Sequence, residues 1–168
     1  MTKERIRIGI AFSGGGARGI AHIGILQALE ENGFAPQVVA GTSAGAIVGA
    51  LYASGHSPQQ MMEFVKDASL LKIVKVRLPY SGLSKLTYLR DRLAAFIPED
   101  RFEALQKQLY IAVTNLNTGQ LEILDKGPLF RAVMASSAIP LVFQPVEIDG
   151  QLYVDGGLLE NMPIRPLV

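Results

Sequence analysis

Several residue types that often carry protein chemistry are missing or rare in this chain. Its 168 residues include no cysteine, no tryptophan and two histidines, and the net charge is +1 at pH 7. The lack of cysteine excludes disulfides, thiolate metal sites and a cysteine nucleophile. His22 and His56 do not have the spacing of paired metal ligands, so we expect no metal or cofactor. Because the charge is nearly balanced, nothing in it favours a nucleic-acid partner.

Long apolar runs are also absent, and none approaches the length that spans a bilayer. The polar start, Met1–Arg5, leads directly into a strand pattern without the apolar region and cleavage site of a signal peptide. We therefore expect a cytoplasmic protein, with peripheral membrane contact as a further expectation. The chain ends in Leu167-Val168 without a closing helix pattern. We expect one domain over residues 1–168 that lacks its final elements.

The residues that are present have the composition of a globular α/β protein, with 49% hydrophobic and 18% charged. Apolar runs and helical periodicity alternate along the first third, which predicts a mostly parallel sheet covered on both faces. Further along, turn residues between strand patterns predict two β-hairpins. The expected strands cover residues 6–12, 36–40, 109–115, 120–124, 146–148 and 152–154; the expected helices cover 18–32 and 46–53, one from Ser57, one over 88–96 and one after Pro128.

Ser43 lies at the junction of a strand pattern and a helix pattern, in the sequence GTSAG of Gly41–Gly45. This is the setting of a nucleophile elbow, in which a serine side chain projects from a sharp strand-to-helix turn. The flanking glycines allow the backbone to turn tightly. The alternative is that the glycines only pack the turn and Ser43 caps the helix.

A serine nucleophile needs a base, and the histidines do not supply one. In an α/β-hydrolase the histidine follows the serine and the acid, but no histidine follows His56. His56 is separated from Ser43 by roughly 20 Å if the helix between them is continuous. His22 is expected to be a packed or surface histidine. A Ser-His-Asp triad is therefore disfavoured.

Carboxylates are the remaining candidates for the base. Asp155 follows a strand pattern and precedes Gly156-Gly157, so its side chain is well placed to face a site, with a turn or cap role as the alternative. Asp149 precedes a glycine between two strand patterns and is explained by the turn. Asp125 belongs to a solvated turn. Asp155 is the strongest candidate.

A glycine-rich loop over Gly14–Gly16 can offer backbone N–H groups to a developing oxyanion, and the N–H of Ala44 is a further donor. The loop also fits the dinucleotide pattern G-x-G-x-x-G through Gly19. That alternative expects an acidic residue at the end of the second strand, where this chain has Ala40-Gly41, so we disfavour it. Arg18 is a candidate for binding a phosphate or an anionic head group, or else an ordinary surface arginine.

Four segments together resemble the patatin-like phospholipase family. They are Gly14–Gly19 (GGGARG), Gly41–Gly45 (GTSAG), Ala135–Pro140 (ASSAIP) and Asp155–Gly157 (DGG). They occur in the order of that family's motifs and cover nearly the whole chain. The short spacing between them is most similar to the compact bacterial members.

The resemblance implies a three-layer α/β/α fold with a mostly parallel central sheet. It also implies hydrolysis of lipid acyl esters by a Ser–Asp dyad. Ser43 would be the nucleophile, Asp155 the base, and Gly14, Gly15 and Gly16 the oxyanion donors. The expected partner is a phospholipid or another acyl-ester lipid.

Two other functional classes stay open from the sequence. One is a different serine acyl enzyme, such as a thioesterase or acyltransferase. The other is a regulatory module that binds a lipid or a protein without catalysis. The segment Leu70–Arg77, which alternates apolar residues with Lys72, Lys75 and Arg77, is a candidate for contact with anionic lipid or, alternatively, a partly buried element with solvated cations.

Overall fold

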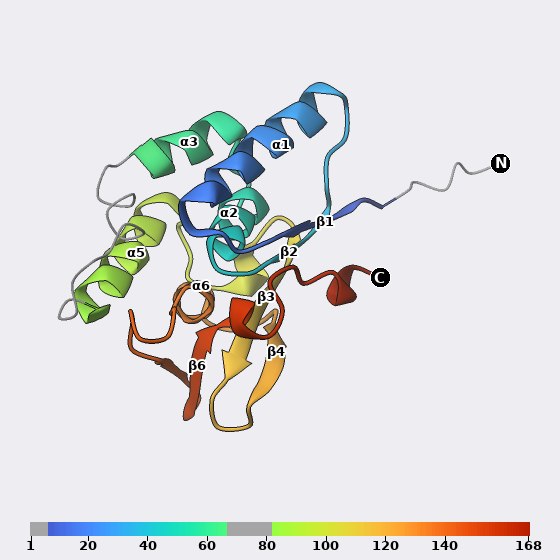
Figure 1. The fold of residues 1–168 in the computed structure, drawn as a ribbon. Helices are drawn as coiled ribbons and strands as arrows, with labels where there is room; N and C mark the ends of the chain where they lie inside the picture. The colour runs from blue at the N-terminus through green and yellow to red at the C-terminus, as the bar shows by residue number, and fades with distance from the viewer. Residues whose placement is uncertain (1–6, 67–81) are drawn as a thin grey trace.

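The computed structural model describes residues 7–66 and 82–168 and has a central sheet with helices packed against it (Figure 1). The strands are β1 (Gly9–Phe12), β2 (Val38–Gly41), β3 (Gln108–Asn115), β4 (Gln120–Leu124), β5 (Val146–Ile148) and β6 (Gln151–Asp155). The helices are α1 (Ile20–Glu31), α2 (Ala44–Ala53), α3 (Pro58–Lys66), α5 (Gly82–Phe96) and α6 (Leu129–Ser136). Short 3₁₀ turns are η1 (Gly16–Gly19), η2 (Phe102–Ala104), η3 (Gly156–Leu158) and η4 (Arg165–Leu167).

The six-stranded sheet has the order β1-β2-β3-β6-β5, with β4 paired to β3 as well. β1, β2 and β3 are parallel, whereas the β3–β4, β3–β6 and β5–β6 pairs are antiparallel. The parallel part is the part whose strands are joined by helical crossovers, and short turns join the antiparallel hairpins. The predicted α/β class and both hairpins are confirmed, and the sheet is mixed.

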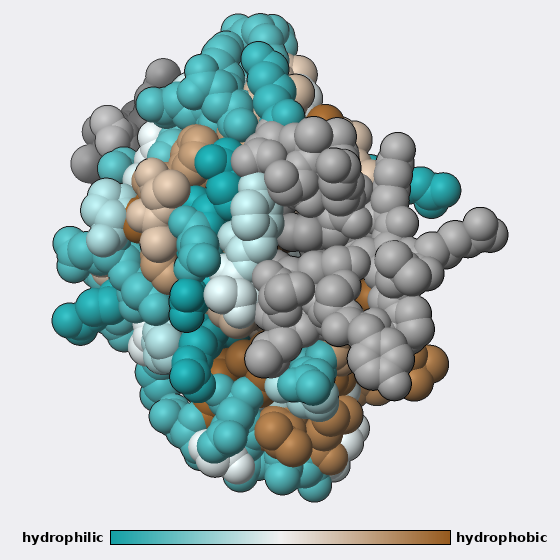
Figure 2. All heavy atoms as spheres, turned by 90° about the vertical axis from the view of Figure 1, so that its left-hand side faces the viewer, coloured by the Kyte–Doolittle hydropathy of each residue, from teal (hydrophilic) through white to brown (hydrophobic). Residues whose placement is uncertain are grey.

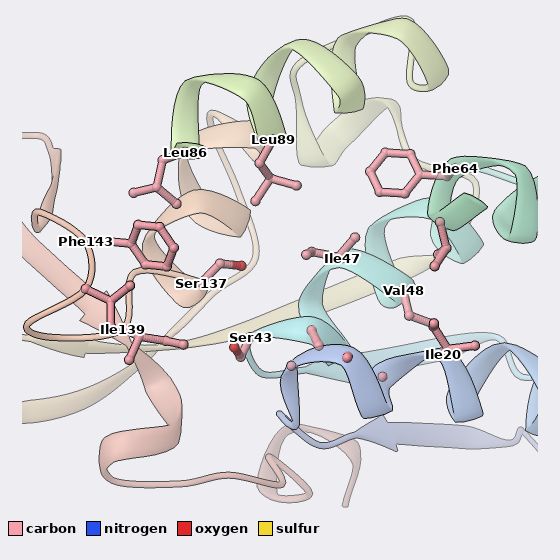
Figure 3. A pocket seen from close by; sticks show the side chains of 16 residues that line it. Ile20, Ser43, Ile47, Val48, Phe64, Leu86, Leu89, Ser137, Ile139 and Phe143 are labelled. Atoms are coloured by element: carbon pink, nitrogen blue, oxygen red, sulfur yellow. The ribbon is translucent and has the colours of Figure 1, made fainter. Parts of the chain in front are cut away.

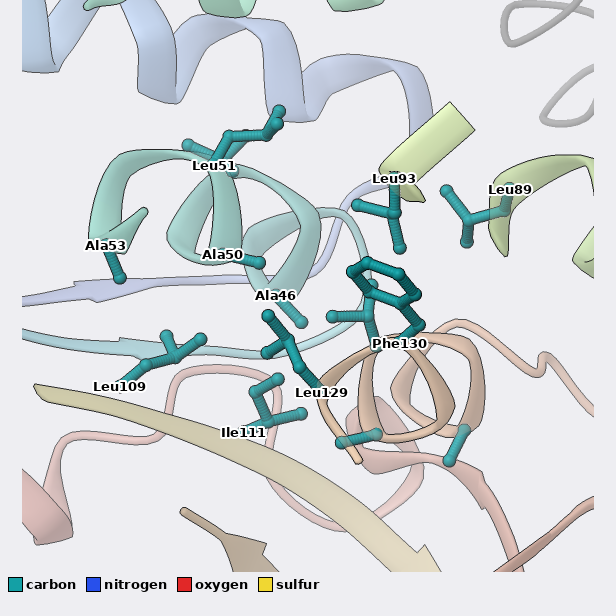
Figure 4. Close-up of a cluster of buried hydrophobic side chains, with 14 of the residues drawn as sticks. Ala46, Ala50, Leu51, Ala53, Leu89, Leu93, Leu109, Ile111, Leu129 and Phe130 are labelled. Atoms are coloured by element: carbon teal, nitrogen blue, oxygen red, sulfur yellow. The ribbon is translucent and has the colours of Figure 1, made fainter. Parts of the chain in front are cut away.

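The core lies between the sheet and helix α2, which comes directly after β2. Gly49 lets this helix approach the sheet closely, since a Cβ there would lie 3.1 Å from the Leu109 side chain and 3.2 Å from that of Val39. Helix α6 packs beside α2, and Leu129 of α6 is fully buried next to it (Figure 4). The sequence places small residues where α2 meets the sheet and larger ones around it. This close packing holds the N-terminus of α2 in one position over the strand ends.

The opposite face of the sheet receives the C-terminal segment. Successive residues of a strand face opposite sides of the sheet. Phe12 faces α2, so Gly9, three residues earlier in β1, lies on the other face. Gly9 lies against Leu167, and η4 contacts both β1 and β2. In the described part of the chain, β1 and β2 are thus covered by a helix on one face and by this segment on the other.

The structure bears on one of the two expectations about membranes, the absence of a spanning helix, but not on the other, lipid contact by Leu70–Arg77. Among the described residues, no helix is long and apolar enough to cross a bilayer. The segment Leu70–Arg77, with Lys72, Lys75 and Arg77, lies outside the described residues, so its contact with anionic lipid stays a prediction.

Candidate active site

Ser43 sits at the sharp turn between β2 and α2. Its backbone has φ 54° and ψ −120°, a conformation that residues with a side chain rarely adopt. The turn needs glycine next to it, because a Cβ on Gly45 would collide with the carbonyl oxygen of Phe12. The Ser43 hydroxyl makes no capping hydrogen bond to α2, so the capping alternative is wrong. This is the geometry of a nucleophile elbow.

Ser136 at the end of α6 holds the strained turn in place. Its hydroxyl oxygen accepts a hydrogen bond from the Ser43 N–H at 2.8 Å and donates one to the Ala112 carbonyl at 2.7 Å. Ser136 is fully buried, so neither bond competes with water. The hydroxyl thereby joins the elbow, α6 and the middle of β3. Backbone strain of this kind persists only where the surroundings enforce it.

Asp155, the last residue of β6, lies beside Ser43. Burial raises the pKa of its carboxyl above the ordinary aspartate value, while the neighbouring Ser43 hydroxyl and a hydrogen bond from the Gly157 N–H, at 2.7 Å, oppose the rise. The backbone of Asp155 is tied on both sides, with its N–H donating to Ala138 and its carbonyl accepting from the Thr114 hydroxyl. A buried carboxylate with a raised pKa is better suited to accept a proton.

Gly156 explains why a glycine must follow Asp155. A Cβ there would collide with the carbonyl oxygen of Ala112, the same carbonyl that accepts from Ser136. The close approach of β6 to β3 therefore brings Asp155 toward the elbow.

The glycine loop lies against the elbow, and its amides are not equivalent. The Gly14 N–H donates to the Asn161 carbonyl at 3.1 Å, and a Cβ on Gly14 would lie 3.2 Å from the Ser43 Cβ. Within the described part of the chain, no hydrogen bond occupies the N–H groups of Gly15, Gly16 and Ala44. Of the four expected oxyanion donors, three are thus free, and the Gly14 amide is already used to hold the loop.

A cavity of about 190 Å³ opens beside Ser43 (Figure 3). The described side chains around it come from η1, α1, α2, α3, α5 and the segment after α6, and none of these described residues is charged. The lining residues are Gly16, Ala17, Gly19, Ile20, Ser43, Ala44, Ile47, Val48, Phe64, Val65, Leu86, Leu89, Ser137, Ile139, Val142 and Phe143. Such a cavity fits the hydrocarbon part of a ligand.

Ser137 gives this cavity one buried polar atom besides the Ser43 hydroxyl. Its side-chain oxygen has no hydrogen-bond partner among the described residues. An unpaired buried hydroxyl is costly unless something else pairs with it. In Figure 3 the Ser137 side chain points into the cavity, between Phe143 and Ile47.

The remaining candidates take no part in the contacts described above. The His22 ring nitrogen Nε2 lies 2.9 Å from the Ser13 carbonyl oxygen, and the His56 Nδ1 lies 2.8 Å from the Ser54 hydroxyl at the far end of α2. His22 is packed, as expected, and His56 is held beside Ser54 just beyond the end of α2. Asp149 is exposed in the β5–β6 turn with φ 49°. Arg18 is exposed in η1 and does not line the cavity.

The sequence analysis missed three residues that shape the site. Ser136 and Ser137 lie in the segment Ala135–Pro140, which carried the resemblance but received no role. Asn161, whose carbonyl binds the Gly14 amide, follows the aspartate motif by six positions and has no sequence signal of its own. Tertiary contacts bring Ser136 and Asn161 to the site: Ser136 bonds the Ser43 N–H and the Ala112 carbonyl, and the segment after β6 brings Asn161 to the Gly14 amide.

The chain is similar to a known family and to known proteins over nearly its whole length. The family model described as patatin-like phospholipase matches residues 10–168. An uncharacterized NTE family protein of Mycobacterium bovis is 33% identical over 163 residues, which cover 96% of this chain and 45% of that protein. Lysophospholipase NTE1 of Yarrowia lipolytica is 32% identical over 167 residues, covering 95% of this chain and 12% of the yeast protein. The chain thus spans less than half the length of these relatives.

Solved structures share the fold. The crystal structure of VipD from Legionella pneumophila superposes with a TM-score of 0.62 at 20% identity, over 94% of this chain and 47% of VipD. Full-length ExoU of Pseudomonas aeruginosa, in complex with SpcU, gives a TM-score of 0.60 at 20% identity, over 81% of this chain and 39% of the matched chain.

Proposed function

Because this chain belongs to the patatin-like phospholipase family, we propose that it is a serine-dependent hydrolase of lipid acyl esters. One observation carries the proposal. The Ser43 hydroxyl borders an apolar cavity and lies next to the buried carboxylate of Asp155, whose pKa it lowers against the effect of burial. The relatives named lysophospholipase NTE1 support the same class of substrate.

In the first half of the reaction, Asp155 accepts the proton of the Ser43 hydroxyl while the serine oxygen attacks the ester carbonyl carbon. The tetrahedral intermediate carries a negative charge on the former carbonyl oxygen. The unoccupied N–H groups of Gly16 and Ala44, which border the cavity, stabilise this oxyanion, together with Gly15 from the same loop. When the intermediate collapses, Asp155 returns its proton to the departing alcohol and the acyl group stays on Ser43.

In the second half, water replaces the alcohol. Asp155 takes a proton from the water as it attacks the acyl-serine carbonyl, and the same amides stabilise the second oxyanion. Collapse frees the fatty acid and returns the proton to Ser43. The Gly14 amide takes no part, since its bond to the Asn161 carbonyl keeps the loop against the elbow.

The cavity would bind the acyl chain of the lipid and leave its head group outside. Its uncharged walls accept the acyl chain, with Phe64, Leu89 and Phe143 among the side chains that would surround it. A charged head group would stay outside the cavity, toward solvent. A contact between this head group and Arg18 stays a prediction, as does peripheral attachment to a membrane.

Labelling with a fluorophosphonate probe tests the nucleophile. We expect covalent labelling of the unaltered protein at Ser43 and no labelling of Ser43→Ala. Hydrolysis of a p-nitrophenyl acyl ester should fall to background in both Ser43→Ala and Asp155→Asn, with circular dichroism unchanged. Full turnover in either variant would overturn the dyad.

The same measurements separate the other functional classes. A non-enzymatic lipid-binding module would bind lipid but leave the probe unreacted. A thioesterase would prefer acyl thioesters over oxygen esters and phospholipids of equal chain length, so profiling these three substrates decides between the two enzyme classes.

A further inference from the structure

The turn between α6 and β5 places apolar side chains outside the mouth of the cavity. Ile139 and Val142 line the cavity and are also 45% and 39% exposed. Leu141, between them, does not line the cavity and is fully exposed. The apolar lining therefore continues without interruption onto the outer surface. Figure 2 shows apolar side chains gathered on the lower part of one face of the molecule.

The backbone holds Leu141 in this outward position. Its φ is 68°, in the left-handed region that leucine rarely adopts. The N–H groups of Val142 and Phe143 both donate to the Ile139 carbonyl, at 3.2 and 2.9 Å. Phe143 is buried, so it anchors the turn while Leu141 points to solvent. The positive φ and the exposure of an apolar side chain to water are both unfavourable. Residues that combine such features commonly contact a ligand, a partner or a membrane.

The charge pattern indicates what this surface meets. No charged residue occurs from Ala132 to Val146, between Arg131 and Glu147. The turn thus offers neither attraction to anionic head groups nor ion pairs to a protein partner. What it matches is the uncharged hydrocarbon boundary of a lipid layer.

We propose that the turn Ile139–Phe143 inserts into a lipid surface through Leu141 and sets the cavity mouth against the acyl chains. This inference rests on the proposed function, because it describes how a lipid reaches Ser43. An acyl chain moves from the layer along Ile139 and Val142 into the cavity without crossing water. The binding is driven by apolar burial, so it needs no anionic lipid and changes little with salt.

The test uses vesicles of phosphatidylcholine alone and protein carrying Ser43→Ala, so that binding does not depend on turnover. Leu141→Asn and Leu141→Gly replace the leucine by residues that accept a positive φ, which keeps the fold intact. Co-sedimentation should show affinity on the order of tenfold weaker for both, from the lost hydrocarbon burial. Leu116→Asn is the matched control, since Leu116 is also an exposed leucine but follows β3, outside the turn Ile139–Phe143. It should bind like the parent.

The outcomes are separable. Equal vesicle binding by the parent, Leu141→Asn and Leu141→Gly overturns the proposal, as does binding that requires anionic lipid. A shift from dimer to monomer in Leu141→Asn, with vesicle binding unchanged, identifies a contact between copies instead and also overturns it. If the protein with Ser43 intact is not labelled by the fluorophosphonate while Leu141→Asn still loses vesicle binding, the lipid surface stands and the proposed hydrolase does not.

Discussion

Replacing Ser136 by alanine removes one hydroxyl that serves two buried groups. The Ser43 N–H loses its acceptor at 2.8 Å and the Ala112 carbonyl loses its donor at 2.7 Å. A buried polar group left unpaired costs about 1–3 kcal/mol, so for the two groups together we expect the free energy of unfolding to fall by about 2–6 kcal/mol. For a domain of this size each kcal/mol lowers the melting temperature by about 2–4 °C, which gives a drop of roughly 4–24 °C.

The neighbouring serine provides the control. The Ser137 hydroxyl is buried without a partner in the described part of the chain, so Ser137→Ala strands no other group. Its stability should stay the same or rise by about 1 kcal/mol. Two adjacent serines, each losing one hydroxyl, are therefore expected to change stability in different directions. Urea unfolding followed by circular dichroism measures both.

The Ser136 change should also lower catalysis at temperatures where the variant is fully folded. The freed Ser43 N–H lets the strained elbow relax, which moves the hydroxyl relative to Asp155. We expect kcat for a p-nitrophenyl ester to fall roughly 10- to 100-fold with little change in KM, because positioning is lost and the binding cavity is not. If Ser136→Ala unfolds and reacts like Ser137→Ala, the assigned role of the Ser136 hydrogen bonds is wrong.

Four further predictions concern the site and the residues around it. Gly45→Ala should lower soluble expression and activity together, since its Cβ would overlap the Phe12 carbonyl, and normal activity in a thermally stable variant would contradict this. The acid limb of kcat/KM should lie above the ordinary aspartate range, because burial raises the pKa of Asp155 and only the ionised form accepts the proton. Because the pKa of Asp155 is raised in the folded state, the protonated side chain stabilises the fold at low pH, and this stabilisation is lost as the pH rises. Asp155→Asn should therefore be more stable than the unaltered protein at neutral pH, which denaturant titration can check. His22→Gln and His56→Gln should both keep turnover, and loss of activity with intact folding in either would point to a histidine base.

Local patterns predicted the parts of the structure that depend on neighbouring residues in the chain. Helical periodicity and turn residues located the helix after Gly41–Gly45 and both hairpins, which the structure confirms. The absence of any histidine beyond His56 removed the triad before any geometry was known. The order and direction of the strands could not be predicted in full from local patterns. The sheet is mixed because β4, β5 and β6 are antiparallel to their partners, and β3 and β6 pair although they lie far apart in the chain.

The sequence by itself determined which groups are available at the candidate site: one serine at a tight glycine turn, one aspartate at a strand end, and a glycine-rich loop that can offer backbone amides. These are local properties of composition and motif. Only the tertiary structure decided how they are used. It pairs β6 with β3 so that Asp155 reaches Ser43, and it engages the Gly14 amide with Asn161. It also brings Ser136 under the elbow and turns Leu141 outward. Such contacts join segments far apart in the chain, and packing decides them.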